Sequence, residues 1–179
     1  MCILEYLNVI NMINSPIPVN NAGIVILNSF IPALFERLNL TNSNNFKDEE
    51  SRQKAVLYLH YLVTGMQEGQ EDLLSLNKLI CGMAPDIILT AAITVTPAER
   101  NLIEGLITAA IGYWSSIGES SVTGFRANWL LRMGLLQEME NCWELTVEKR
   151  AYDILLNHSP FSFSVVKYPW MDKPLQIKW

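Results

Sequence analysis

The chain has 179 residues, a formal net charge of −5, 50% hydrophobic residues and 17% charged residues. This length suffices for one domain that buries most of its apolar surface, and the composition excludes a disordered tail. The acidic balance disfavours non-specific binding to nucleic acid or to an anionic membrane.

The first thirteen residues are almost entirely apolar, and Pro16 and Pro18 follow them. This segment lacks the basic start and the small-residue cleavage site of a signal peptide, and it is shorter than the roughly 20 apolar residues of a membrane span. We expect it to dock as a strand or helix on the domain or on a partner, without stable membrane insertion. The chain is thus divided into an N-terminal apolar segment and linker, residues 1–19, and a single globular domain, residues 20–179.

Helix-forming patterns dominate the next part of the chain. Residues 24–40 predict a helix that bends or restarts at Pro32, and residues 41–45 predict a polar loop. A second helix begins at the acidic residues 48–50 and ends at Gly65, with apolar residues on two faces. A shorter helix covers residues 72–81 and is closed by Gly82.

The sequence Thr96-Pro97-Ala98-Glu99 marks the start of another helix. Threonine suits the N-cap, proline the first helical position, and glutamate the third position of a capping box. We expect this helix to end at Gly118 and a further helix to run from Ser121 to Met133, closed by Gly134. The expected core face of the first of these helices comprises Leu102, Leu106, Ala110, Tyr113 and Ile117, widened by Ile103, Ile107 and Trp114.

The last part of the chain predicts β-structure. Residues 135–139 and 142–147 form a hairpin, a helix passes through Tyr152, and alternating apolar residues in 161–165 and 175–179 indicate two half-buried strands. The predicted fold class is therefore α+β, mainly helical with five to six helices and a small antiparallel sheet near the C-terminus. The order of helix, turn, helix and hairpin in residues 97–148 is also that of a winged-helix DNA-binding domain.

Several groups of residues follow one another along the chain in an order typical of one family. They are residues 21–27 and 30–38, 76–82, 124–126 with 131, 132 and 134, 143–148, 150–156, 169–171 and the final Trp179. In this order they resemble the C-terminal domain of the tape measure proteins of contractile injection systems, which are phage-tail-like particles that puncture other cells. The resemblance covers about residues 20–179.

The resemblance implies a structural assembly protein. Its partners would be the spike, the baseplate or the inner tube, and homo-oligomer formation is left open. We expect no enzymatic activity and no cofactor, because catalytic motifs are missing, and no nucleic-acid binding, because the chain is acidic. It would be cytoplasmic during assembly and later lie within the contractile particle. A fully helical chain of this length would span only about 270 Å, and its glycines and prolines forbid one rod, so we expect a terminal domain or a short adaptor rather than the measuring rod itself.

The sequence contains no recognisable catalytic or metal-binding motif. His60 and His158 lie in no H-E-x-x-H frame, and there is no G-x-S-x-G elbow or phosphate-binding loop. Cys142, Asp153 and His158 match no metal-ligand spacing. Three cysteines without a C-x-x-C pair fit a reducing compartment, where they act as small apolar side chains. The alternatives to an assembly role are a winged-helix DNA binder, for which the acidic balance is unfavourable, and a general protein-interaction module.

Arg126 falls inside the apolar stripe of its predicted helix. A guanidinium there forms a buried pair, for which Asp153 is the first candidate and Glu148 the second, or extends to the helix edge, or contacts a partner. Lys78, between apolar neighbours, poses the same question. Trp170 either completes the core or anchors a partner, and a truncation after Lys167 separates these readings. The structural or partner-contact candidates are Phe30, Pro32, Phe35, Lys78, Cys81, Gly82, Trp114, Arg126, Arg132, Trp143, Tyr152, Asp153, Pro169, Trp170 and Trp179.

Overall fold

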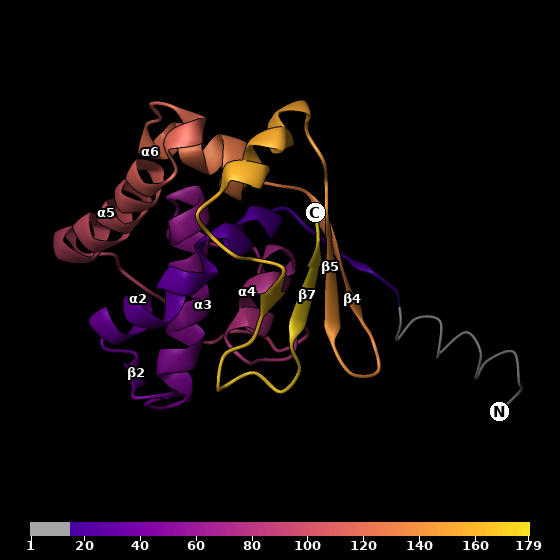
Figure 1. Cartoon of the computed structure of the whole chain (residues 1–179). Coiled ribbons are helices and arrows are strands. Elements are labelled where there is room, and N and C mark those ends of the chain that lie inside the picture. The colour runs from indigo at the N-terminus through magenta and orange to yellow at the C-terminus, as the bar shows by residue number, and fades with distance from the viewer. Residues whose placement is uncertain (1–14) are drawn as a thin grey trace, which may run out of the picture.

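The computed structural model describes residues 15–179, so the apolar segment 1–13 lies outside the described residues. Helices cover one face of a five-stranded sheet that stands at one side of the molecule (Figure 1). This arrangement confirms the predicted α+β class. The elements in chain order are β1 (Ile17–Val19), η1 (Ala22–Phe30), α2 (Ile31–Arg37), β2 (Thr41–Asn42), β3 (Asn45–Phe46), α3 (Glu49–Thr64), η2 (Glu71–Leu73), α4 (Ser75–Ile80), α5 (Pro97–Tyr113), η3 (Ser115–Ile117), α6 (Val122–Phe125), η4 (Arg126–Leu130), β4 (Gly134–Glu138), β5 (Trp143–Val147), η5 (Ala151–His158), β6 (Val165–Val166) and β7 (Leu175–Lys178).

The sheet has the strand order β1-β4-β5-β7-β6. β4 and β5 form the predicted hairpin, with Leu136 opposite Leu145, and β1 and β6 pair antiparallel with β4 and β7. β7 is parallel to β5, because residues 148–174 carry the chain back to the starting end of β5 before β7 begins. The sequence predicted neither this parallel pair nor strand β1. Since β4 and β5 lie between β1 and β7, their hairpin is an interior part of the sheet and not a free wing.

The expected first helix is built from two pieces. Residues 22–30 form the 3₁₀ segment η1, and α2 then starts with Pro32 in its first turn, where a missing backbone N–H costs nothing. The predicted restart at Pro32 is thus confirmed. η1 packs so closely on η4 that a Cβ on Gly23 would lie 1.7 Å from the backbone oxygen of Trp129. Only glycine permits this approach.

Helix α3 begins and ends where its sequence predicts. The Asp48 carboxylate caps the start by accepting a hydrogen bond from the backbone N–H of Ser51 (2.7 Å), and Gly65 ends the helix with φ of +75°. Leu59 and Leu57, on different sides of the helix, are both buried. The second apolar face therefore packs within the domain, and α3 is its central helix.

Helix α5 has the predicted capping box, in which Thr96 and Glu99 bond each other's backbone. The buried stripe is rotated from the expected one, because the neighbouring elements contact only one side of this peripheral helix. Tyr113, an expected core residue, has 68% of its surface exposed. The residues that face the core are Ile103, Ile107, Ala110 and Trp114.

The helix after α5 differs from its prediction at its C-terminal end. Ser121 caps α6 as expected, but residues 126–130 then widen into the π-helical segment η4. Met133 is 53% exposed instead of buried, and Gly134 begins β4 instead of closing a helix. The wider turn of a π-helix shifts the register that a period of 3.6 predicts.

Strand β6 also differs from its predicted alternation. Val165 is exposed, and Val166 is the buried residue of this strand.

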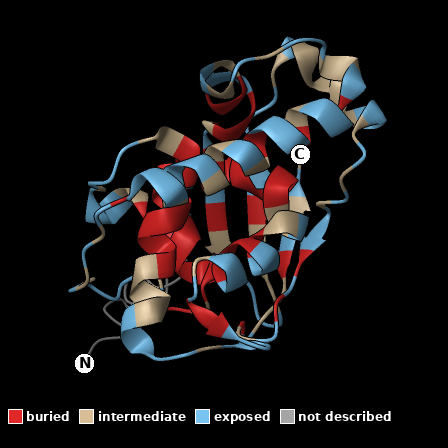
Figure 2. Ribbon diagram, turned by 90° about the vertical axis from the view of Figure 1, so that its left-hand side faces the viewer, coloured by how far each residue is buried: buried red, intermediate tan, exposed pale blue. Residues whose placement is uncertain are grey.

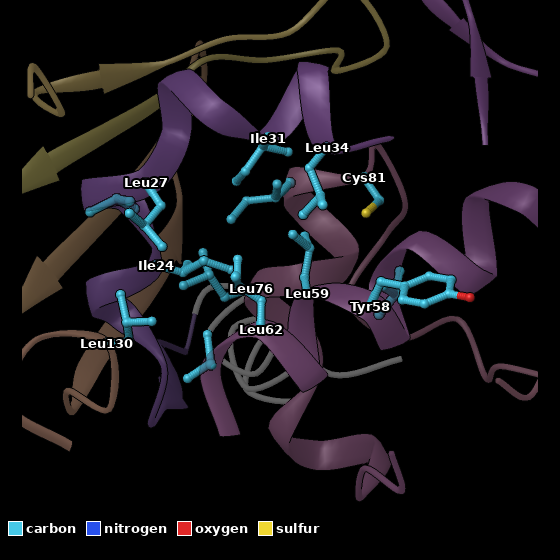
Figure 3. Packing of buried hydrophobic residues seen from close by; sticks show 14 of the residues in the cluster. Ile24, Leu27, Ile31, Leu34, Tyr58, Leu59, Leu62, Leu76, Cys81 and Leu130 are labelled. Atoms are coloured by element: carbon cyan, nitrogen blue, oxygen red, sulfur yellow. The ribbon is translucent and has the colours of Figure 1, made fainter. Parts of the chain in front are cut away.

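The core collects side chains from elements far apart in the sequence. Residues of η1, α2, α3, α4 and η4 meet between the helices and the inner face of the sheet. Figure 2 shows the buried residues concentrated in the middle of the molecule and the exposed ones on the outer elements. Figure 3 shows Leu59 and Leu62 of α3 among Ile24, Leu76 and Leu130. This core fixes the ends of α3, α4 and η4, where the polar groups described next are held.

Candidate functional site

The C-terminal residues converge on a buried arginine. The Arg132 side chain is fully buried and donates to both carboxylate oxygens of Asp153, at 2.6 and 3.2 Å. It also donates to the backbone oxygens of Asn128 (2.9 Å) and Glu148 (3.3 Å). Its guanidinium carbon lies 5.0 to 5.5 Å from the ring centres of three aromatic residues, namely Trp129, Tyr152 and Trp179.

Asp153 is the acceptor that ties this cluster together. Besides Arg132, it accepts hydrogen bonds from the backbone N–H of Arg150 (2.8 Å) and from the indole N–H of Trp179 (2.9 Å). Burial alone would raise the pKa of Asp153, but these hydrogen bonds outweigh burial and lower it. The final residue of the chain is thereby fastened to a charged pair that the fold holds inside.

The predicted pairing of Arg126 with Asp153 is wrong. Arg126 is buried as expected, but it donates to the backbone oxygens of Leu62 (2.9 Å) and Tyr61 (3.3 Å), and its nearest carboxylate is Glu104 at 4.0 Å. Both carbonyls belong to the last turn of α3 and carry partial negative charge. The oxygen of Tyr61 also accepts a hydrogen bond from the backbone N–H of Gly65 (2.7 Å). Arg126 therefore caps α3. Burial lowers the pKa of Arg126 below its usual value.

Lys78 is also buried and paired. Its ammonium donates to Glu71 at 2.6 Å and to the backbone oxygen of Pro85 at 3.3 Å. Burial alone would raise the pKa of Glu71, but the bonds from Lys78 and from the backbone N–H of Leu89 lower it. The lysine thus fastens α4 to the connection 83–95. The sequence did not reveal Glu71 as its partner, because Glu71 lies just before the predicted helix 72–81 and belongs to no periodic pattern.

Trp170 packs between the C-terminal segment and the helices α2 and α4. Its indole N–H donates to the backbone oxygen of Ile80 (2.9 Å), and its ring lies 5.1 Å from Tyr168 and 5.9 Å from Phe35, centre to centre. Its backbone oxygen lies so near Gly82 that a Cβ there would be 2.1 Å away, and Gly82 has φ of +71°. Gly82 is therefore required both for its backbone conformation and for this contact.

The other sequence candidates lie around these centres. Cys81 and Phe35 are buried, whereas Pro32 and Pro169 are exposed. Trp114 is fully buried beside Trp129, with ring centres 4.5 Å apart, and Phe30 contacts Phe161. Burial raises the pKa of the Cys81 thiol, which fits an inert core residue rather than a nucleophile. Arg132, Tyr152, Asp153 and Trp179 come together in one cluster. Gly82, which contacts Trp170, and Trp143 both line a surface groove.

This groove, here called the tail groove, has a volume of about 640 Å³. Its apolar floor comes from Ile17 of β1, Leu79 of α4 and Trp143 of β5, together with Met83, Ala84, Pro85 and Met171 of the connections. Its polar rim is formed by Asp86, Glu138, Asp172 and Lys173. Glu138 and Lys173 pair with each other at 2.7 Å, whereas the carboxylates of Asp86 and Asp172 form no ion pair with any residue in 15–179.

Sequence reasoning found Gly82 and Trp143 but missed the two carboxylates of the tail groove. Asp86 follows Pro85 in a connection and Asp172 lies between two prolines, so neither belongs to a periodic pattern. Their common surface arises only when α4, β5 and the tail come together. The groove can therefore accept an apolar segment that carries a cation.

Within residues 15–179, no group of three or more His, Cys, Asp and Glu side chains is placed to hold a metal ion. Among the described residues, no helix is both long enough and apolar enough to cross a membrane. The strongly buried ionisable groups are instead engaged in internal contacts.

One protein-family model, described as contractile injection system tape measure protein, matches residues 11–179, which is essentially the whole chain. Neither the curated proteins nor the solved structures contain a match to this sequence.

Proposed function

Because the chain belongs to the contractile injection system tape measure protein family, we propose that it is a non-enzymatic assembly component that contacts the spike, the baseplate or the inner tube. The observation that carries this proposal is the family match over residues 11–179, which leaves no large part of the chain for another activity.

The pairing of buried charged side chains inside the domain supports a structural role. Lys78, Arg126 and Arg132 are buried, and each donates a hydrogen bond to at least one backbone oxygen. Lys78 and Arg132 also bond a carboxylate on another element, and Arg126 lies 4.0 Å from the carboxylate of Glu104. Such contacts hold the helices and the tail in one arrangement. A protein that presents fixed surfaces to its neighbours requires this rigidity. The same contacts leave these three cations unavailable for a substrate.

We assign the contact with the particle to the tail groove. Its apolar floor and its two unpaired carboxylates, Asp86 and Asp172, match a partner segment with apolar side chains next to a lysine or arginine. In this proposal the chain meets its partner in the cytoplasm during assembly and then remains within the particle. The alternative is that a second copy of this chain binds in the same groove.

Nucleic-acid binding is the competing function. The arginines that a recognition helix would offer, Arg126 and Arg132, are both buried, and the formal net charge is −5. Both facts favour a protein partner, because phosphate contact requires exposed cations. A gel shift that weakens with added salt would support the competing function instead.

The test is co-purification of the tagged chain with each particle protein expressed separately, together with electron microscopy of particles made with and without the chain. We expect one of the spike, baseplate or tube proteins to be retained and particle formation to fail or to lose length control without the chain. Normal particles in its absence would contradict the proposal.

The tail groove is tested with the double variant Asp86→Lys with Asp172→Lys, which reverses both free carboxylates. Co-purification should fall by about tenfold or more, because two attractive contacts become repulsive. The matched control is Glu68→Lys with Glu119→Lys, which makes the same charge change at exposed positions outside the groove. Equal loss in both double variants would mean that net charge, and not the groove, determines the contact.

A further inference from the structure

A second groove lies between α2 and α5. It has a volume of about 370 Å³, and Figure 1 shows these two helices on the side of the molecule away from the sheet. The α2 wall is formed by Phe30, Ala33, Leu34 and Arg37, which recur at positions i, i+3, i+4 and i+7. This spacing places all four on one face of a helix, so the wall is a continuous stripe.

The α5 wall is a second helical stripe. It is formed by Asn101, Leu102, Gly105, Leu106, Ala109 and Tyr113. Along α5 this stripe runs from Asn101 to Tyr113, which is twelve helical rises or about 18 Å. The two helical stripes form a groove whose α5 wall matches a third helix of about three turns.

Small residues on the α5 wall allow the backbone of a partner to approach this helix closely. A Cβ built on Gly105 would meet no atom within 4 Å, so the space above this position is open. Ala109, one turn further on, is exposed. A partner backbone can therefore approach α5 more closely here than it could over large side chains.

The two ends of the groove differ in chemistry. Phe30 and Trp114 both contact the ring of Phe161, so the start of α2 lies near the end of α5. One end of the groove is consequently aromatic, with Phe30 and Tyr113. The opposite end holds Arg37 and Asn101.

Arg37 gives the groove its charge. It is the one charged residue of the groove lining, it is exposed, and it forms no ion pair within the described part of the chain. In a symmetric contact with a second copy of this chain, the lining of the other groove would offer no carboxylate to Arg37. A partner that carries a carboxylate would satisfy the free guanidinium.

We propose that the groove between α2 and α5 binds an amphipathic α-helix of a partner protein, with an aliphatic stripe on Ala33, Leu102 and Leu106 and a carboxylate at Arg37. This inference names a second contact for the assembly role and rests on that proposed function. It would make the chain an adaptor, since the tail groove accepts a cation and this groove accepts an anion.

The test is photo-cross-linking in cells that produce the particles, with a benzophenone amino acid at Ala109 and mass spectrometry of the cross-linked segment. We expect the cross-linked segment of the partner to be an amphipathic helix that carries an acidic side chain. Arg37→Glu, which reverses the charge, and Gly105→Leu, which fills the groove, should each lower the cross-link yield about tenfold.

Two matched variants control for net charge and for a new leucine on α5. Lys149→Glu reverses an exposed cation elsewhere, and Gly112→Leu adds a leucine at another open α5 position that does not line the groove. Both should keep the yield within about twofold of the original.

A cross-link to a second copy, to a basic segment or to a non-helical segment would overturn the inference, as would an unchanged yield for Arg37→Glu. A chain that purifies with particles but gives no cross-link from Ala109 would refute this groove while leaving the assembly role intact. A chain that cross-links to an acidic helix but is absent from particles would refute the assembly role and not the groove.

Discussion

The charged pair between Arg132 and Asp153 is the contact whose loss should cost the most stability. Asp153→Ala would leave the guanidinium of Arg132, whose side chain is fully buried, without its carboxylate. The backbone oxygens of Asn128 and Glu148 would remain as acceptors. Removing one partner of a buried pair costs about 3–5 kcal/mol, because the other charge stays buried and uncompensated. In a chain of this length such a loss lowers the melting temperature by roughly 6–20 °C.

The assay is urea unfolding followed by circular dichroism, with Glu138→Gln as the control. Glu138 pairs with Lys173 at 2.7 Å, close to the 2.6 Å of the pair between Arg132 and Asp153. The side chains of Glu138 and Lys173 are both partly exposed. Loss of this pair should cost at most about 1 kcal/mol. The comparison therefore isolates burial, since the two ion pairs have similar geometry.

The double variant Arg132→Met with Asp153→Ala provides the decisive measurement. It removes the buried charge as well as its partner, so we expect it to be about 1–2 kcal/mol more stable than Asp153→Ala alone. If Asp153→Ala costs no more than Glu138→Gln, the buried cation is not the source of the penalty. A double variant less stable than the single one would contradict the same reasoning.

Three further outcomes are expected. Gly82→Ala should destabilise the protein by roughly 2–5 kcal/mol in urea unfolding, the sum of about 1–2 for a left-handed alanine and about 1–3 for the contact with the backbone of Trp170; an effect below 1 kcal/mol would show that the tail does not press on this glycine. Gly105→Ala should instead stabilise it by about 0.5–1 kcal/mol, since the new methyl group meets no atom within 4 Å in an exposed part of α5; a decrease would contradict the open groove. Burial lowers the pKa of His60 in the folded chain. Below about pH 6.5 the unfolded chain therefore binds the proton more readily than the folded one. The contribution of His60 to folding stability is complete above this pH and declines as the pH falls. Unfolding measured at pH 7 and pH 5 should show a smaller difference for His60→Gln than for the original chain, and equal differences would refute this assignment.

The sequence determined the features that depend on a few neighbouring residues. The start and end of α3 at Asp48 and Gly65, and the capping box at Thr96, follow from hydrogen bonds that reach only three or four residues along the chain. The β4–β5 hairpin and the family membership also followed from the order of residues alone.

The tertiary structure decided which distant groups meet. The sequence places Arg126 and Arg132 on one predicted helix, but nothing in it assigns the end of α3 to one and Asp153 to the other. In the structure Arg126 begins η4, whereas Arg132 lies in the connection between η4 and β4.

The parallel pairing of β7 with β5 and the two grooves have the same origin. Each surface combines residues separated by tens of positions, such as Ile17 and Trp143 or Arg37 and Asn101. A periodic pattern shows which face of an element is apolar, but it does not show which other element covers that face. Local hydrogen bonds therefore fixed the elements of this protein, whereas packing between them fixed its charged contacts and the surfaces it offers to partners.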